Sequence, residues 1–509
     1  MYPSFQTFCE FAKDYQMIPI QKEYIADFET PISIFNKIVH EKNVFLLESV
    51  EGGEKWARYS FIGKNPFLIA TIHNQQLILK GTINQEIKTL QPLDELERIL
   101  SDYKSPMIHG MPPFTGGAVG FFAYDIIQYF EKIPKKSGVH NTPEACFLLC
   151  DEIIVYDHKL QKMIIIANIN IDRTTELSKE KLKELYMLAE QRIDHLYSQL
   201  KSNTPQKSVT EKVLKDKIPA FRYRVQSDTS KDEFFAMVDQ AKEYIKSGDI
   251  FQVVLSQKWS IDTLATPFET YRILRTLNPS PYMYYLDIEG IQVVGTSPEL
   301  LVRVADKKIE TKPIAGTRPR GRTESEDLEL EQNLLNDKKE CSEHLMLVDL
   351  GRNDAGRVSE YGSVKVTQFM EIERYSHVMH IVSNVQGQLR DGLTPFDALK
   401  GCFPAGTVSG APKVRAMEII AELEKQSRGL YAGAIGYIGF SGNFDSCITI
   451  RTIIFENGKA YLQAGAGIVY DSIPEMEYQE TINKAKALMS AIEHAEEVFH
   501  IEEKGDLYA

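Results

Sequence analysis

Residues 282–313 limit the possible folds more narrowly than any other part of the sequence. They contain four short segments rich in β-branched and aromatic residues, at 282–288, 291–297, 300–305 and 309–313. The turns between these segments are long enough for antiparallel pairing but too short for the crossover that parallel strands need. Similar segments occur earlier, at 44–49, 60–63, 68–73, 76–80, 117–122, 153–157 and 163–171. The pattern predicts extensive antiparallel sheet.

Helical periodicity between these segments suggests how the chain divides. Apolar residues recur at helical spacing near the N-terminus and over residues 177–200, 231–246, 326–350 and 477–491. A chain of 509 residues is too long for one core, which favours two domains or one large composite. Residues 201–217 are rich in Lys, Ser, Thr and Pro, as linkers often are. We therefore expect an N-terminal domain at residues 1–200, a linker at 201–229 and a second domain at 230–509.

The composition argues against several kinds of partner and location. The 58 basic and 71 acidic residues give a net charge of -13, which disfavours binding to nucleic acid or to anionic membranes. No apolar segment is long enough to cross a bilayer, and the first twenty residues do not resemble a signal peptide. The six cysteines form no C-x-x-C pair and have no metal-ligand spacing. We expect reduced thiols and a cytoplasmic protein.

Two basic features are candidate anion sites. The segment PIAGTRPRGR, residues 313–322, places three arginines and two glycines directly after a strand-like run, although an ordinary basic turn has the same composition. The dipeptide Asn-Gly at 457–458 predicts a two-residue hairpin turn whose register sets Arg451 opposite Ala464. A turn at 442–443 would likewise set Arg451 opposite Ala434. Small neighbours would let Arg451 bind a carboxylate, and pairing with a core Asp or Glu is the alternative.

Two expected helices carry glutamates that could hold a metal ion. Glu340 and Glu343 lie on helix 326–350, while Glu477 and Glu480 are three residues apart on one face of the last helix. One glutamate from each helix, with water and substrate oxygens, would suit Mg2+. Surface salt bridges, for example between Glu480 and Lys484, are the alternative.

The segment PAGTVSGAPKVR, residues 404–415, is a glycine-rich turn before a helix, with Pro412 at a plausible first position. Its amides could face an anion. It is not a nucleotide-binding P-loop, because Gly410-Ala411 stands where Gly-Lys-Ser/Thr is required. His380 lies in a strand-like apolar stretch, where a hydrogen-bonded core histidine is the alternative to a catalytic one.

Four long motifs occur in order along the chain: PIAGTRPRGR, ECSEHLMLVDLGRND, GTVSGAPKVRAME and QAGAGIV. Together they closely resemble the chorismate-utilising enzymes, and more narrowly the anthranilate synthase component I family of large subunits. The resemblance covers a region to about residue 170 and another from about 230 to 490. It implies an α+β fold of large antiparallel β-sheets in a sandwich surrounded by helices. It also implies an N-terminal regulatory domain and a C-terminal chorismate-binding catalytic domain.

The resemblance implies chorismate as substrate and Mg2+ as cofactor. At the matching positions, Glu343 and Glu480 would bind the metal, with Glu340 and Glu477 beside them. Arg451 would hold the enolpyruvyl carboxylate of the substrate. The residues that would line the chorismate site are Gly316, Thr317, Tyr431, Arg451, Gly465, Ala466 and Gly467.

By the same resemblance, Glu299 in Ser297-Pro298-Glu299 protonates the C4 hydroxyl as it leaves. His380 and Thr407 belong to the chemistry, with His380 assisting its second stage. Gln252 stands where a lysine base would be expected to activate water, so ammonia is favoured over water as the nucleophile. Isochorismate and salicylate synthases, which add water, are thereby disfavoured.

Ala315 separates two aminating reactions. The 4-amino-4-deoxychorismate synthases usually carry Lys at the centre of this motif, where it can attack the ring, and Ala cannot. The expected function is therefore conversion of chorismate and ammonia to anthranilate and pyruvate, the first committed step of tryptophan biosynthesis. 4-Amino-4-deoxychorismate synthase component I is the alternative.

The resemblance also implies partners and regulation. No cysteine has the G-x-C-x-G setting of a glutaminase nucleophile, so use of glutamine would require a separate glutamine amidotransferase subunit, component II, in a heterotetramer. L-Tryptophan is the expected feedback inhibitor. Its site would combine Ser49 from one domain with Pro281, Tyr282 and Met283 from the other. A non-catalytic tryptophan-binding regulator is the alternative from another class of protein.

Overall fold

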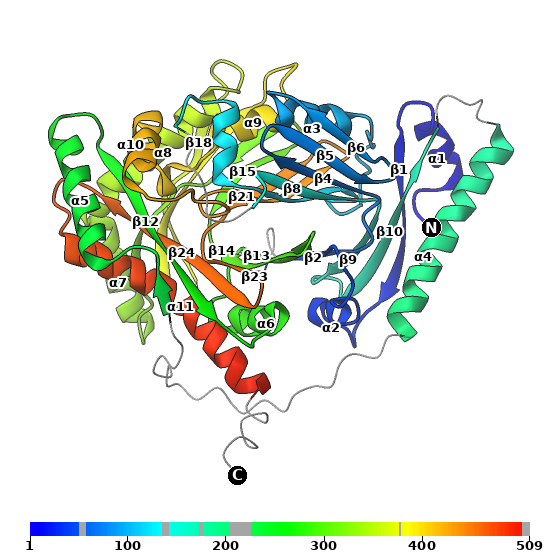
Figure 1. The fold of residues 1–509 in the computed structure, drawn as a ribbon. Helices are drawn as coiled ribbons and strands as arrows, with labels where there is room; N and C mark the ends of the chain where they lie inside the picture. The colour runs from blue at the N-terminus through cyan, green and yellow to red at the C-terminus, as the bar shows by residue number, and fades with distance from the viewer. Residues whose placement is uncertain (50–57, 135–141, 173–177, 203–224, 376–377, 501–509) are drawn as a thin grey trace, which may run out of the picture.

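Two large sheets facing each other dominate the fold. The computed structural model describes residues 1–49, 58–134, 142–172, 178–202, 225–375 and 378–500. Within these residues the strands form two twelve-stranded sheets in which every pairing is antiparallel, and helices cover the outer faces (Figure 1). The expected α+β sandwich is confirmed.

Each sheet takes strands from both ends of the chain. The first sheet runs β1 (Met17–Ile25), β10 (Lys162–Asn170), β9 (Glu152–Asp157), β3 (Tyr59–Gly63), β2 (Val44–Glu48), β13 (Tyr282–Ile288), β14 (Ile291–Ser297), β23 (Thr452–Glu456), β24 (Lys459–Ile468), β12 (Gln252–Asp262) and β11 (Val225–Ser227), and β20 (Gly410–Ala411) pairs with β12. The second sheet runs β17 (Ile314–Pro319), β19 (Val378–Gln388), β16 (Lys308–Thr311), β15 (Leu300–Ala305), β22 (Phe444–Ile448), β21 (Ala434–Gly439), β7 (Gly117–Phe122), β8 (Ala145–Cys150), β4 (Leu68–His73), β5 (Gln76–Gly81) and β6 (Gln85–Lys88), and β18 (Lys365–Arg374) pairs with β19.

Helices pack on the outer side of each sheet (Figure 1). On the first sheet these are α1 (Phe5–Phe11), α2 (Pro31–Asn36), α4 (Lys179–Ser202), α6 (Pro267–Leu277) and α11 (Pro474–His500), with α5 (Lys231–Lys246) and α10 (Lys413–Leu423) against β12. On the second sheet they are α3 (Pro92–Ser101), α7 (Glu324–Asn336), α8 (Lys338–Gly356) and α9 (Pro395–Cys402). Two 3-10 turns, η1 (Tyr124–Tyr129) and η2 (Gly406–Val408), complete the helical elements of the described residues.

The alternation of side chains along the strands explains the layers. On β10, Ile164 and Ile166 pack in the core between the sheets, whereas Ile165 and Ala167 pack in the outer core with α4. Successive residues of a strand point to opposite faces, so a strand that is apolar throughout must be covered on both sides. Each fully buried aliphatic side chain stabilises the fold by roughly 1.5–3 kcal/mol before entropy is counted. The apolar strands therefore specify the sandwich.

The strands predicted from the sequence are confirmed, as is the helix at residues 231–246. The single helix predicted at 326–350 is wrong, because the chain forms α7 and then α8. The side chain of Asp337 accepts hydrogen bonds from the backbone amides of Lys339 (3.0 Å) and Glu340 (3.2 Å) and so begins a new helix. Glu340 thereby falls in the first turn of α8.

One predicted hairpin register is confirmed and the other is wrong. Glu456 pairs with Lys459 as expected. Ala434 pairs with Ile448 and not with Arg451. The turn after β21 is wider than two residues, since Gly439 N donates to the carbonyl of Asn443. Arg451 consequently lies off the strands, where the chain crosses from the second sheet to the first, with φ of 50°.

The expected division of the chain stays a prediction. Residues 203–224 of the linker predicted at 201–229 lie outside the described residues, as does residue 177, the predicted start of the preceding helix. Strands from both sides of the linker pair directly, β2 with β13 in the first sheet and β7 with β21 in the second. In the described part of the chain, no helix has the length and apolar character to cross a bilayer.

Candidate active site

Glu299 and Thr407 form a hydrogen-bonded pair between the two sheets. Glu299 lies just before β15, and Thr407 lies in η2. The hydroxyl of Thr407 donates to Glu299 Oε2 at 2.8 Å. Burial raises the pKa of Glu299, while the Thr407 hydrogen bond and the charges of Arg451 and Lys484 oppose the rise. Glu299 therefore keeps its proton to higher pH than an exposed glutamic acid does.

Arg451 is a partly buried cation in the crossover between β22 and β23. Its backbone oxygen accepts a hydrogen bond from Thr296 N at 3.1 Å. Burial lowers the pKa of Arg451, and the nearby Glu299 and Tyr375 oppose this effect. Among the residues that the structure describes, none forms a salt bridge with its guanidinium. The predicted alternative, a core Asp or Glu partner, is not formed there, so the guanidinium is available to an anionic ligand.

His380 lies on β19 opposite Thr317 of β17. Its Nδ1 is 3.0 Å from both Thr317 Oγ1 and the carbonyl oxygen of Gly316. Burial lowers the pKa of His380 and the charge of Arg451 lowers it further, so the ring is neutral near neutral pH. Because the Gly316 carbonyl can only accept, Nδ1 carries the hydrogen there and Nε2 is left as an acceptor.

Two of the three arginines of segment 313–322, Arg318 and Arg320, bind protein side chains. Arg318 donates to Asp337 (2.8 Å) and Asn333 (2.9 Å). Arg320 forms a fork with the carboxylate of Asp327, with both closest contacts at 2.9 Å. The predicted turn is largely strand β17. Arg318 and Arg320 therefore order the segment, and Gly316 and Thr317 beside His380 remain its candidate ligand contacts.

Glycines of β24 leave space for two polar side chains. A Cβ at Gly467 would lie 2.6 Å from Nε2 of Gln252, and one at Gly465 would lie 2.7 Å from the hydroxyl of Tyr431. Gln252 Nε2 also donates to Glu343 Oε1 at 3.3 Å, which links β12 to α8. The side chain of Ala466 packs in the core under α5 and α10, so Ala466 can meet a ligand only through its backbone.

The four predicted acidic residues lie at the starts of α8 and α11. Burial raises the pKa of Glu340, and so does the charge of Glu343. Burial likewise raises the pKa of Glu477, and the negative charge of Glu480 raises it further. Glu480 forms a salt bridge with Lys484 at 2.7 Å, as the alternative from sequence expected. No group of three or more potential metal-binding side chains was found within the described ranges.

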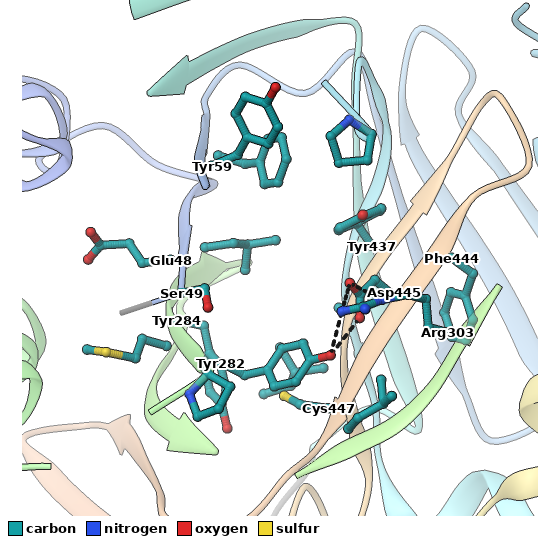
Figure 2. Close-up of a pocket in the computed structure, with 18 of the residues that line it drawn as sticks. Glu48, Ser49, Tyr59, Tyr282, Tyr284, Arg303, Tyr437, Phe444, Asp445 and Cys447 are labelled. Carbon is teal, nitrogen blue, oxygen red and sulfur yellow. Dashed lines mark hydrogen bonds and ion pairs between the residues drawn. The ribbon is translucent and has the colours of Figure 1, made fainter. Parts of the chain in front are cut away.

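A cavity of about 530 Å³ separates the sheets near β2 and β13. Ser49, Pro281, Tyr282 and Met283, predicted from two distant segments, all line it. Figure 2 shows Ser49 and Tyr282 on its wall. The hydroxyl of Tyr282 donates to Asp445 Oδ1 (2.9 Å) across the gap between the sheets. The structure therefore gathers these four residues around one cavity, whose lining also includes Pro298 and Leu300 on either side of Glu299 in the chain.

Three residues around this cavity were missed from the sequence. Arg303 and Asp445 form a salt bridge of 2.8 Å on its wall, and Tyr375 lines it while placing its ring 5.6 Å from the ring of His380. A charged residue inside an apolar strand segment was the signal that could have identified Arg303. No sequence pattern marked Tyr375, because its position depends on the register of β18 against β19.

Comparison with known proteins identifies the family. A sequence model described as chorismate binding enzyme matches residues 43–490. Anthranilate synthase component 1 of Acetivibrio thermocellus is 51% identical over 98% of this chain and 99% of its own length. The protein of the same name from Aquifex aeolicus is 48% identical over 96% of this chain and 97% of its own. The chain belongs to the chorismate binding enzyme family and, within it, to the anthranilate synthase component 1 proteins.

Solved structures agree with this assignment. The crystal structure of anthranilate synthase component I from Streptococcus pneumoniae has a TM-score of 0.73 and 41% identity, covering 86% of this chain and 95% of that one. The menaquinone-specific isochorismate synthase of Escherichia coli has a TM-score of 0.68 at 19% identity, covering 96% and 98% of the two chains. The second likeness concerns the fold alone.

Proposed function

We propose that the chain converts chorismate and ammonia to anthranilate and pyruvate. The relatives named anthranilate synthase component 1 support this reaction over almost the whole chain. The observation that carries it is the juxtaposition of the Glu299–Thr407 pair with the guanidinium of Arg451, which forms no salt bridge with any residue that the structure describes. Glu299 can donate a proton to the C4 hydroxyl of chorismate as it leaves. Arg451 can bind a carboxylate of the substrate.

In this proposal, Arg451 binds the enolpyruvyl carboxylate. Tyr431 and the backbone of Gly465, Ala466 and Gly467 form one wall of the substrate site. Gly316 and Thr317 form the wall opposite, next to His380. Holding both carboxylates aligns the ring with the acid and the nucleophile before bonds change. The proposal is supported by the glycines at 465 and 467, because a side chain at either position would clash with Tyr431 or Gln252, respectively.

Mg2+ is the cofactor of the proposal, with Glu343 and Glu480 as its ligands. Negative charge gathered at the starts of α8 and α11 fits a cation, because Glu343 and Glu480 raise the pKa of their neighbours Glu340 and Glu477. Two carboxylates with water and substrate oxygens make the sparse site that Mg2+ prefers. Glu480 would have to exchange its contact with Lys484 for the ion. The ion would polarise the ring carboxylate of chorismate.

The reaction then proceeds in two stages. Glu299 gives its proton to the C4 hydroxyl, which leaves as water while ammonia adds at C2. In the second stage a ring proton is lost and the enolpyruvyl group departs as pyruvate, which makes the ring aromatic. His380, with Nε2 open as an acceptor, assists this stage. The amide of Gln252 cannot act as a base toward water, and Ala315 cannot attack the ring, so direct amination is favoured.

Ammonia derived from glutamine would come from a separate glutamine amidotransferase subunit, and the complex would be a heterotetramer. The names of the relatives, which specify a component 1, support a further component. L-Tryptophan would bind in the 530 Å³ cavity and inhibit. Support comes from Tyr375, which borders both this cavity and His380. A ligand there can favour a less active arrangement only if it binds that arrangement more tightly.

Dependence on ammonium tests the choice of nucleophile. The pure chain is incubated with chorismate and Mg2+, with and without ammonium, and its products are separated by chromatography. We expect chorismate to be consumed only when ammonium is present. Formation of isochorismate or salicylate without ammonium would contradict the proposal.

A further inference from the structure

A buried ion pair lies behind the candidate active site and has no part in the reaction as described. Arg428 precedes β21 and is 2% exposed, and Glu424, at the end of α10, is 5% exposed. Arg428 donates to the two carboxylate oxygens of Glu424, at 2.9 and 2.6 Å. Burial alone would lower the pKa of Arg428, but the charge and hydrogen bonds of Glu424 outweigh burial and leave it raised. Arg428 is therefore a buried cation.

The remaining donors of Arg428 join two backbone segments of the site. Nη1 donates to the carbonyl of Val408 at 2.6 Å, and Nη2 donates to the carbonyl of Val254 at 2.7 Å. Val408 directly follows Thr407 in η2, and Val254 lies on β12 two residues after Gln252. Arg428 thus ties the turn that carries Thr407 to the strand that carries Gln252.

Glu424 and an aromatic ring extend this connection. Glu424 Oε1 accepts hydrogen bonds from the amide (2.9 Å) and hydroxyl (2.8 Å) of Ser256, farther along β12. The guanidinium carbon of Arg428 lies 5.5 Å from the ring centre of Tyr431, whose hydroxyl approaches Gly465. One buried cation therefore contacts η2, β12 and the base of the proposed substrate wall.

We infer that Arg428 is a positioning residue for the proposed amination, which holds η2 so that the hydroxyl of Thr407 meets the carboxyl of Glu299. The inference rests on the proposed function. Arg428 is 2% exposed, too little to touch a substrate, and its guanidinium donates to Glu424 and to the backbone carbonyls of Val408 and Val254. A buried ion pair often adds little net stability over an apolar pair, so stability alone does not account for it. A planar guanidinium can reach three acceptors in fixed directions, which a lysine ammonium on a flexible stem cannot.

A double-mutant cycle between Arg428 and Thr407 tests the inference. Arg428→Lys and Thr407→Val are each expected to lower kcat with ammonia at least about tenfold. If Arg428 acts through Thr407, the double variant should lose no more than about threefold beyond Thr407→Val alone. If the fold-losses in kcat of the two single variants multiply in the double variant, the inference is overturned, because Arg428 then acts independently of Thr407.

The pH profile supplies a readout that a purely structural role would not move. The Thr407 hydrogen bond lowers the pKa of Glu299. Arg428→Lys and Thr407→Val should therefore both move the alkaline fall of kcat/KM to higher pH, by the same amount. If Arg428→Lys lowers kcat/KM at every pH but leaves the alkaline fall at the same pH as in the wild type, the inference is also overturned.

Control variants keep the test interpretable. Arg192, on α4, forms two salt bridges, with Asp151 (2.8 Å) and Glu152 (2.7 Å). Because neither partner belongs to the candidate active site, Arg192→Lys should leave kcat unchanged. If Arg428→Lys fails to fold, Arg428→Met with Glu424→Gln removes the charges together and should give the same non-additive loss. The wild-type chain is assayed in parallel. Absence of anthranilate from the wild type would reject the proposed function, whereas an additive cycle with an active wild type rejects only the positioning role.

Discussion

In the proposed mechanism, the first chemical stage depends on Glu299. Its carboxyl must be protonated to release the C4 hydroxyl, and burial favours the protonated form. Glu299→Gln keeps the size and the contact with Thr407 but carries no acidic proton. We expect kcat with ammonia to fall by about 100-fold or more, the usual contribution of a general acid. Steady-state kinetics with fluorescence detection of anthranilate checks this, and near-normal turnover would remove Glu299 from the mechanism.

The pH dependence follows from the same group. As pH rises through the pKa of Glu299, the carboxyl loses its proton and the rate must fall. Because burial raises this pKa, the fall should lie above the range of an exposed glutamic acid. The profile of kcat/KM for chorismate is measured at a constant concentration of unprotonated ammonia, so that titration of ammonium does not mask it. A profile that stays flat or rises over this interval would contradict the assignment.

Glu343 tests the metal assignment. Glu343→Gln retains a side-chain oxygen but removes the negative charge at the start of α8. We expect the affinity for Mg2+, measured by calorimetry with chorismate present and ammonium absent, to fall roughly tenfold or more, with loss of turnover. Glu243→Gln, which changes an exposed glutamate of α5, is the control and should alter neither quantity. Unchanged Mg2+ binding in Glu343→Gln would exclude Glu343 as a ligand.

At the scale of single elements, the β23–β24 hairpin was predictable because its signal is local. Asn457 and Gly458 both have positive φ, 52° and 76°, as a tight two-residue turn requires. The β21–β22 turn was mispredicted because its width depends on hydrogen bonds from Gly439 and Gly442. The error moved Arg451 from a strand to the crossover between sheets. Long-range register, unlike a tight turn, is decided by partners distant in sequence.

Gly458→Ala tests the contribution of the turn. The added methyl group would meet no atom within 4 Å, so the strain comes only from the left-handed backbone. We expect the free energy of unfolding in urea to fall by about 1 kcal/mol, with unchanged kcat. Gly356→Ala, at a glycine of α8 with open space and no positive φ, should not destabilise. Equal stability of the two variants would contradict this account of the turn.

At the scale of the whole molecule, the two sheets join segments that the sequence separates by hundreds of residues. The sandwich was predictable from strand spacing and from the four family motifs. The pairing of β2 with β13 was not, yet it is what brings Ser49 near Tyr282 and Met283. The contact of Tyr375 with His380 was likewise not predictable from the sequence, because it is a tertiary contact. The division of the helix at Asp337 has a local cause, the capping of the Lys339 and Glu340 amides, and the continuous apolar pattern obscured it.

The proposed tryptophan site in the cavity between the sheets predicts a substitution that would weaken inhibition. Ser49→Phe would fill part of its 530 Å³, and neither Glu299 nor Arg451 is among the residues that line it. We expect tryptophan inhibition to weaken at least about tenfold while ammonia-dependent turnover stays within about threefold of wild type. Ser101→Phe, at an exposed serine that ends α3, should leave inhibition intact. Normal inhibition of an active Ser49→Phe protein would place the tryptophan site elsewhere.

The products made from chorismate test the central claim most directly. The pure chain is incubated with chorismate, Mg2+ and ammonium, and anthranilate and pyruvate are quantified together by fluorescence and by a coupled dehydrogenase assay. Amination at C2 followed by loss of the enolpyruvyl group predicts the two products in equal amounts. An amino-cyclohexadiene without pyruvate would instead identify a 4-amino-4-deoxychorismate synthase, and unchanged chorismate would indicate a non-catalytic regulator.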